Sequence, residues 1–195
     1  MPEKKMKICV VGCGALGSHL VLMGRNLKVE FTVIDDDRVE QKNIASQFHT
    51  KMGLSKNKTQ ALQQAMNGLF GLAIKTVPHR LTSNNVDSLL SGADVVVDCV
   101  DNGESRRVIQ NYVRSKGIPC LHGALAADGQ FGSVIWDELF KIDDENVRGQ
   151  ATCDGGEFLP FIVDVSSALV RCLQDYLEKD KKINMHLWPY KKMIL

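Results

Sequence analysis

The sequence predicts a single α/β domain that spans residues 1–195 and contains a doubly wound, mostly parallel sheet. Two observations favour this fold class. Short apolar runs alternate along the chain with segments whose apolar residues recur at helical spacing, a pattern typical of parallel strands that helices cover on both faces. The length of 195 residues suffices for one sizeable hydrophobic core, and no internal repeat divides the chain.

The first half of the chain contains apolar runs typical of strands and segments with helical periodicity. The strand runs are short and rich in Val, Ile and Phe, whereas the helical segments place an apolar residue at every third or fourth position. In chain order we expect a strand at 8–11, a helix over 16–27, a strand at 31–34, a helix over 55–69, a strand around 73–77 and a short helix at 86–90.

The second half begins with the run 94–100, whose valines indicate a buried central strand. A helix around 108–113 follows, and Gly117 is expected to end it as a C-cap. The remaining elements are strands at 118–121 and 131–136, a long amphipathic helix over 158–176 and a last edge strand at 183–188. We expect the C-terminal strands to be antiparallel. The polar stretch 137–157 is interpreted as a long surface connection.

Composition indicates an ordinary globular protein with balanced charge. The apolar fraction is 44%, the charged fraction is 24% and the formal net charge is +1. This balance gives no electrostatic reason to expect a nucleic acid or a membrane as partner. No apolar run reaches the roughly 20 residues that span a bilayer, and the run 8–11 is too short for a signal-peptide core. We therefore expect a cytoplasmic protein.

Cysteine and histidine spacing predicts no zinc site. The six cysteines include no Cys-x-x-Cys pair, and the five histidines are scattered along the chain. The histidines are interpreted as surface or core residues rather than as metal ligands. Four cysteines lie in apolar patterns and are interpreted as small buried hydrophobic residues with reduced thiols, namely Cys9, Cys99, Cys120 and Cys172.

A glycine-rich turn follows the first predicted strand and opens the first predicted helix. Glycine is needed there because side chains would keep a phosphate away from the backbone N–H groups, and the helix N-terminus adds a partial positive charge. Asp35 ends the second strand, where a carboxylate can accept hydrogen bonds from ribose hydroxyls. This order is that of a Rossmann-like βαβ unit, and it predicts a bound nucleotide without deciding between NAD and ATP. The residues of the turn expected at the nucleotide are Gly12, Gly14, Ala15, Leu16 and Gly17.

Further polar residues cluster in positions that favour ATP over NAD. Acids, amides and basic residues follow the second and the central strand, so they meet at the C-terminal edge of the sheet, where open α/β folds bind ligands. Carboxylates there could hold Mg²⁺ and a lysine could neutralise a triphosphate, and NAD requires neither. The residues concerned are Asp35, Asp37, Asn43, Gln47, Lys58, Asp98, Asp101 and Asn102.

These motifs resemble those of the ThiF/MoeB/HesA family, the bacterial relatives of ubiquitin-activating enzymes. That family shows a GxGxxG turn, an acid-x-acid pair, an Asn-x-x-Arg-Gln turn, a lysine that opens a helix and a strand ending in Asp-x-x-Asp-Asn. The resemblance is strong from about residue 6 to residue 136 and weak to about residue 180. The matching residues are Gly12, Gly14 and Gly17, then Asp35 and Asp37, Asn43 and Gln47, Lys58, and Asp98, Asp101 and Asn102.

The resemblance implies ATP-dependent adenylation of the C-terminal glycine carboxylate of a ubiquitin-like sulfur carrier or modifier that ends in Gly-Gly. It implies that Asp35 holds the ribose, that Asp101 orients Mg²⁺, and that Lys58 and Asn43 contact the triphosphate. Lys56 competes with Lys58, because its spacing from a preceding glycine also fits the family. Lys58 is preferred for its distance from the Asn-x-x-Arg-Gln turn. The family further implies a homodimer.

One departure from the family keeps two other functions open. The arginine of the Asn-x-x-Arg-Gln turn is replaced by Ser46, and Arg38 and Lys42 are the candidates to take its place. One alternative is therefore a degenerate family member that binds nucleotide or carrier without catalysis. The other is an NAD-binding protein, which only the glycine turn and Asp35 support.

Cys153 is a candidate for covalent catalysis. It lies in the sequence Thr-Cys-Asp-Gly-Gly just before the long amphipathic helix, and resembles a Thr-Cys segment that carries a thioester or persulfide in some family members. A thiol near a helix N-terminus has a lowered pKa, so a larger fraction of it is present as the nucleophilic thiolate. The alternative is a loop cysteine without a chemical role.

Overall fold

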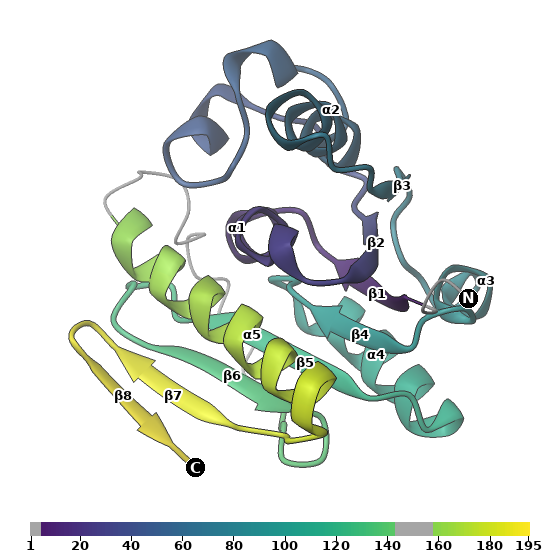
Figure 1. The fold of residues 1–195 in the computed structure, drawn as a ribbon, viewed down its shortest axis with the longest axis vertical. Helices are drawn as coiled ribbons and strands as arrows, with labels where there is room; N and C mark the ends of the chain where they lie inside the picture. The colour runs from purple at the N-terminus through teal and green to yellow at the C-terminus, as the bar shows by residue number, and fades with distance from the viewer. Residues whose placement is uncertain (1–4, 143–157) are drawn as a thin grey trace.

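The computed structural model describes residues 5–142 and 158–195, and Figure 1 shows them arranged around one sheet. The sheet has eight strands in the order β3-β2-β1-β4-β5-β6-β7-β8. The strands are β1 (Met6–Val11), β2 (Val29–Ile34), β3 (Lys75–Val77), β4 (Val95–Asp98), β5 (Cys120–Leu125), β6 (Gly132–Trp136), β7 (Met185–Trp188) and β8 (Lys191–Ile194).

The sheet is parallel in its first part and antiparallel in its second, as the sequence predicts. Strands β3, β2, β1, β4 and β5 are parallel, whereas β5 to β8 pair antiparallel. Val10 at the centre of β1 pairs with Val33 of β2 on one side and with Val97 of β4 on the other. The order changes direction between β1 and β4, so the loops after these strands lie next to each other at the sheet edge where such folds bind ligands.

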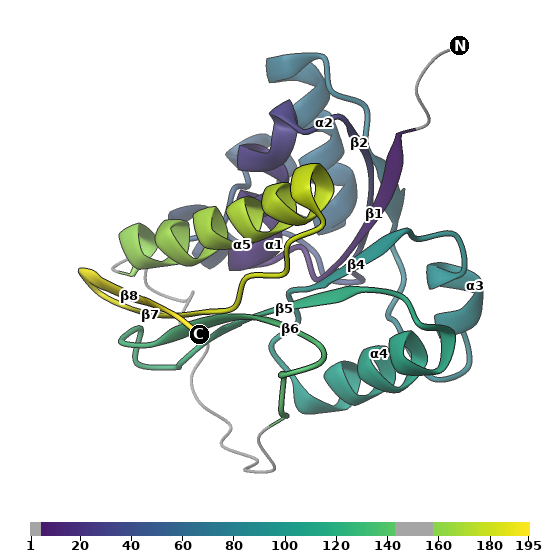
Figure 2. The same ribbon diagram turned by 60° about the horizontal axis from the view of Figure 1, so that its bottom comes forward.

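Helices cover both faces, as Figure 2 shows. One face carries α1 (Ala15–Met23), α2 (Lys58–Phe70) and α5 (Leu159–Lys179), and the other carries α3 (Val86–Leu90) and α4 (Gly103–Lys116). Each face has its own hydrophobic cluster: Leu20 and Leu169 belong to the first, and Ile109 belongs to the second. Short 3-10 helices complete the described elements at Gly24–Asn26, Gln41–Ala45 and Lys51–Gly53.

Local capping explains where several helices differ from the prediction. The helix expected from residue 55 begins at Lys58, because Asn57 accepts the N–H of Thr59 through its side chain (2.9 Å) and caps the helix. Gly117 ends α4 with a left-handed φ of 66°, as predicted. The long helix extends to Lys179 because it ends only at Asp180, which adopts a left-handed φ of 51°.

The C-terminal end of the sheet corrects one prediction. Residues 183–188 were expected to form the last edge strand, but β7 pairs with a strand on each side and β8 is the edge. The turn between them is made by Pro189 and Tyr190, the latter with a φ of 66°. Strand β8 begins with Lys191 and Lys192, so a search for apolar runs misses it. Lysine is nevertheless common on edge strands.

The polar connection and the cysteines differ from the prediction in detail. Asp137, the first residue of the expected surface connection, is buried, so that prediction is wrong at this residue. Residues 143–157, with Cys153, lie outside the described residues. Burial raises the pKa of the Cys9 and Cys172 thiols to about 12, which fits small buried hydrophobic residues. Cys120 is buried and Cys99 half-buried, and Cys13 in the glycine turn is buried as well.

The described helices include none that is long and apolar enough to cross a membrane.

Candidate active site

The glycine turn lies where the loops after β1 and β4 touch. Gly12 has a φ of 96°, and its N–H donates to the carbonyl of Ile34 (2.9 Å) at the end of β2. A Cβ on Gly12 would lie 2.7 Å from the carbonyl oxygen of Cys99, just after β4. A Cβ on Gly17 would lie 1.9 Å from the carbonyl oxygen of Gly12. These two positions therefore require glycine, because backbone packs directly on backbone there.

Gly14 has a different role from the other two glycines. A Cβ built on it meets no atom within 4 Å among the described residues, so the space above the turn is open. Gly14 is also the N-cap of α1, and it brings no side chain to bind the first N–H groups of Ala15 and Leu16. An unblocked helix N-terminus that faces open space is a suitable place for a phosphate.

Asp35 ties the end of β2 to this turn. One carboxylate oxygen accepts the N–H of Cys13 (2.6 Å) and the other accepts the N–H of Asp37 (2.8 Å). Burial raises the pKa of Asp35, against the opposing effects of the Cys13 N–H and the Lys58 charge. The carboxylate is thus fixed beside the glycine turn, and each oxygen keeps a lone pair with which to accept a further hydrogen bond.

Lys58 brings a cation to the same place. Its Nζ lies 2.7 Å from Oδ2 of Asp37, and only 9% of its side chain is exposed. Burial lowers the pKa of Lys58, but the hydrogen bond to Asp37 and the charge of Asp35 outweigh it, so that the pKa is raised overall. Lys56 is exposed instead, and its Nζ bonds Gln64 (2.8 Å) on the outer side of α2. The geometry therefore favours Lys58 over Lys56.

The segment with Asn43, Ser46 and Gln47 folds under the glycine turn. Oδ1 of Asn43 accepts the N–H of Glu40 (2.8 Å), and the Asn43 carbonyl accepts the N–H of Gln47. Ser46 is fully buried, and its carbonyl oxygen lies 3.2 Å from Nε2 of His19. Oε1 of Gln47 is buried without a hydrogen-bond partner among the described residues. The two side chains of this segment predicted at the nucleotide, Asn43 and Gln47, are thus buried.

Asp98 is completely buried, unlike the other carboxylates predicted at the nucleotide. Its Oδ2 lies 3.3 Å from Arg106 and 2.8 Å from Nδ1 of His122, and its Oδ1 accepts the N–H of Val100. Burial raises the pKa of Asp98, but the charges of Arg106 and His122 outweigh it and lower the pKa overall. With no exposed surface, Asp98 supports the loop after β4 instead of presenting a free carboxylate to a nucleotide.

Asp101 and Asn102 lie at the open end of that loop. Asp101 is exposed, two residues beyond Cys99, whose carbonyl borders the glycine turn. Asn102 caps α4, since its Oδ1 accepts the N–H of Ser105 (2.9 Å). Arg106 on α4 holds the loop from below by donating to the carbonyl oxygen of Val100 (2.6 Å). Asp101 is therefore the carboxylate of this loop that is free to meet a ligand.

The sequence did not predict the rest of the network around Asp98. Nε2 of His122 lies 3.1 Å from Asp137, which also accepts from Gln110 and Arg114. The ring of Phe140 stacks on that of His122 at 4.0 Å between centroids. Burial opposes ionisation of Asp137, but the hydrogen bonds from His122 and Arg114 lower its pKa to about 2. These residues come from different elements, and their spacing in the sequence carries no signal of their contact.

The donor set of the site suits Mg²⁺ better than zinc. The described ranges contain one group of three metal-ligating side chains close together, Asp35, Asp36 and Asp37, and it includes no cysteine or histidine. Asp35 and Asp37 already bond backbone N–H groups and Lys58. Mg²⁺ is usually held by one or two carboxylates together with the substrate's phosphates. The exposed carboxylate of Asp101 beside the glycine turn fits that coordination.

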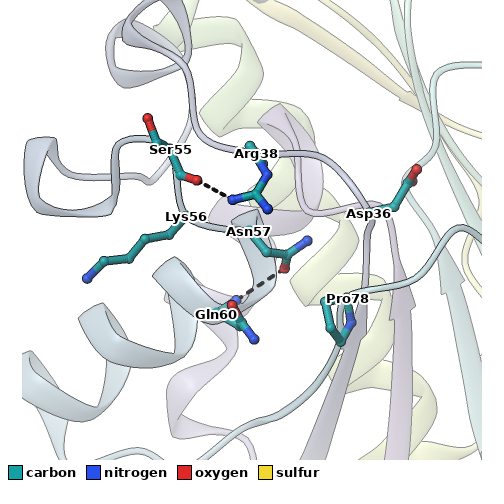
Figure 3. Close-up of a pocket in the computed structure, with 7 residues that line it drawn as sticks. All are labelled: Asp36, Arg38, Ser55, Lys56, Asn57, Gln60 and Pro78. Carbon is teal, nitrogen blue, oxygen red and sulfur yellow. Dashed lines mark hydrogen bonds between the residues drawn. The ribbon is translucent and has the colours of Figure 1, made fainter.

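A polar hollow of about 400 Å³ lies on the outer side of the Asp35–Asp37 loop, and Figure 3 shows its lining. Arg38 lines it and donates to the carbonyl oxygen of Ser55 (2.6 Å), so its guanidinium is engaged away from the glycine turn. Lys42 is exposed and lies 3.7 Å from Glu40. The full lining is Asp36, Arg38, Ser55, Lys56, Asn57, Gln60 and Pro78.

Known proteins are similar to this chain in sequence and in fold. The family model described as the ThiF family matches residues 4–184. The chain is 32% identical over 135 residues to the SAMP-activating enzyme E1 of Haloferax volcanii. The aligned region covers 67% of this chain and 50% of that protein. The chain is 32% identical over 134 residues to the sulfur carrier protein adenylyltransferase of Thermus thermophilus, covering 65% and 48%. It is 30% identical over 170 residues to the adenylyltransferase and sulfurtransferase UBA4 of Yarrowia lipolytica, covering 82% and 42%.

Solved structures agree on the fold. The crystal structure of E. coli MccB with ATP superposes with a TM-score of 0.77 over 98% of this chain and 63% of that one, at 15% identity. The chain spans about half the length of the curated relatives it matches, or less. The match of the family model over most of the chain, together with the glycine turn and the acids around it, shows that this protein belongs to the ThiF family.

Proposed function

We propose that this chain uses ATP and Mg²⁺ to adenylate the C-terminal glycine carboxylate of a ubiquitin-like carrier protein that ends in Gly-Gly. The relatives named as adenylyltransferases, one of them acting on a sulfur carrier protein, support this reaction class. The glycine turn, the Lys58 ammonium group and the exposed Asp101 carboxylate support it as well, because they follow strands at one edge of the sheet.

The position of Lys58 is the observation that carries the proposal. Its ammonium group is nearly buried, is held by Asp37, and stands close enough to Asp35 for the two charges to interact. Asp35 in turn bonds the glycine turn, so a cation stands beside the cradle for phosphates. A triphosphate that loses pyrophosphate needs such charge neutralisation, whereas hydride transfer from a nicotinamide does not. This arrangement favours ATP over NAD.

In the proposed reaction an oxygen of the carrier carboxylate attacks the α-phosphorus of ATP, and the bond from that phosphorus to pyrophosphate breaks. The chain contributes by positioning and by neutralising charge. Asp35 would accept the ribose hydroxyls, and the first N–H groups of α1 would bind the phosphates. Lys58 and the side-chain amide nitrogen of Asn43 would contact the triphosphate. Asp101 would hold Mg²⁺, which supplies further charge neutralisation when bound.

Ser46 supports a second candidate function. The family's arginine at this position is replaced by serine, which has no charge to neutralise the phosphates. Ser46 is also fully buried. The second candidate is a protein that binds nucleotide or carrier without completing the adenylation. A homodimer and a covalent role for Cys153 stay predictions from the family resemblance, and a cytoplasmic location stays a prediction from the lengths of the apolar runs.

Exchange of labelled pyrophosphate into ATP tests the proposal. We expect exchange with Mg²⁺ and a recombinant ubiquitin-like carrier ending in Gly-Gly, and none with the same carrier lacking its last two glycines. Asp101→Ala should abolish the exchange and leave the fold intact, while a wild-type rate in that variant would remove Asp101 from the mechanism. Tight ATP binding without exchange would establish the second candidate, and tighter binding of NADH than of ATP would contradict both.

A further inference from the structure

His49 lies directly beneath the glycine turn. Its ring is buried, with 6% of the residue exposed, and its Nε2 lies 3.0 Å from the carbonyl oxygen of Cys13. A carbonyl oxygen can only accept a hydrogen bond, so Nε2 carries the hydrogen and donates it. Asp35 holds the N–H of the same residue at 2.6 Å. Both backbone polar groups of Cys13 are therefore fixed from inside the protein.

The bond from His49 determines the direction of the next N–H group. The described peptide bonds include no cis bond, and in a trans peptide the C=O and N–H groups point in opposite directions. Because His49 draws the Cys13 carbonyl inward, the N–H of Gly14 points outward. Gly14 also borders open space, since an added Cβ would meet no atom of the described residues within 4 Å. This space lies at the unblocked N-terminus of α1.

We propose that His49 is a positioning residue of the phosphate cradle, and that it orients the Cys13–Gly14 peptide so that the Gly14 N–H points at a phosphate of the nucleotide. The inference deepens the proposed function and rests on it, since it concerns the same nucleotide. Glycine at position 14 leaves this peptide free to rotate. A hydrogen bond that anchors the preceding carbonyl therefore reduces the conformational entropy lost when a phosphate binds.

The state of the ring fits this role. Burial and the nearby charge of Lys58 lower the pKa of His49 to about 4 against the opposing effect of the Cys13 hydrogen bond, so the ring is neutral near pH 7. A neutral ring with its hydrogen on Nε2 has an unprotonated Nδ1. That Nδ1 is buried and has no hydrogen-bond partner among the described residues. The hydrogen bond to the glycine turn is thus the polar contact that the ring makes within this part of the chain.

Two variants of similar polarity separate positioning from mere structural support. In His49→Gln the side-chain amide nitrogen can take the place of Nε2 and donate to Cys13, whereas the shorter side chain of His49→Asn cannot reach that carbonyl. We expect His49→Asn to weaken ATP binding about 10- to 100-fold, the cost of one hydrogen bond to a charged group, and His49→Gln to restore most of it. Binding of adenosine, which has no phosphate, should change less than about twofold in either variant.

His19→Gln serves as the matched control. His19 is a similarly buried histidine with a lowered pKa, but its Nε2 contacts the carbonyl of Ser46 instead of the turn. We expect its ATP affinity to stay within about twofold of the wild type. Equal losses for ATP and adenosine in His49→Asn, or equal affinities in the Asn and Gln variants, would overturn the proposal.

A measurement on the unaltered protein keeps the proposal testable even where a variant does not fold. Nitrogen-15 NMR of the wild type should show the hydrogen of His49 on Nε2 between pH 6 and pH 9, and a ring protonated on Nδ1 would overturn the inference. ATP binding without pyrophosphate exchange would refute the adenylation alone, because the His49 experiments measure binding.

Discussion

Replacing Asp98 by asparagine should destabilise the fold strongly, because it removes a fully buried charge from between two buried partners. The Asp98 carboxylate bonds Arg106 and His122, whose side chains are 11% and 0% exposed. Asparagine has nearly the same shape but no charge, so Arg106 would keep a buried positive charge without its counterion. Breaking one side of a buried ion pair in this way costs about 3–5 kcal/mol. We expect the free energy of unfolding of Asp98→Asn to fall by about that amount.

Urea unfolding followed by circular dichroism measures this change, with Asp101→Asn as the control. Asp101 is three residues further on and exposed, so its substitution should change the free energy of unfolding by less than about 0.5 kcal/mol. The same control variant should lose Mg²⁺-dependent ATP turnover. If Asp98→Asn instead costs less than about 1 kcal/mol and weakens ATP binding as much as Asp101→Asn does, Asp98 is a nucleotide ligand and the argument from burial is wrong.

Three further predictions concern the glycine turn and its surroundings. Lys58→Met should weaken ATP binding more than about tenfold by calorimetry and Lys56→Met less than twofold, because only Lys58 is held beside Asp35; equal effects would contradict the assignment. The pKa of His49 is lowered from 6.5 to about 4, so between these pH values the unfolded chain binds the proton and the folded protein does not. The wild type should therefore lose about 1.4 kcal/mol of unfolding free energy per pH unit on acidification relative to His49→Gln, and parallel urea curves at pH 7 and pH 5 would refute this. Gly17→Ala should cost at least about 2–3 kcal/mol in thermal unfolding, since its Cβ would lie 1.9 Å from a backbone oxygen, and a wild-type Tm would contradict it.

Periodicity and glycine chemistry predict the framework of this fold because they are local. The run before the glycine turn and the helix after it lie next to each other in sequence and in space, so their order was enough to predict the turn. Strand β8 escaped prediction because an edge strand buries little, and its Lys191 and Lys192 look like a solvated segment. The contact between His122 and Asp137 joins β5 to the residue after β6, and such a pairing depends on strand register, which the sequence does not reveal.

Asp98 and Asp101 differ in burial although one motif contains both. The Asp-x-x-Asp-Asn motif contains two acids, and both were expected at the nucleotide. Asp98 is the last residue of the continuous buried run that begins at Val95, whereas Asp101 lies beyond the end of the strand. A carboxylate inside a central strand must be paired where it stands, because burying an isolated charge is too costly. The apolar run before Asp98 was therefore a signal in the sequence that this acid is buried, whereas Asp101 beyond the strand is exposed.

Lys58 differs from what local rules predict, and this difference supports the function proposed for it. It is the first residue of α2, where the helix dipole disfavours a positive charge, and its side chain is nearly buried, which disfavours the charge again. The hydrogen bond to Asp37 and the charge of Asp35 outweigh the burial, so the pKa of Lys58 is raised and its side chain stays charged. A charged lysine beside the glycine turn fits the proposed contact with a triphosphate. Broken local rules concentrate at functional sites, and Lys58 breaks two of them, which supports the role proposed for it.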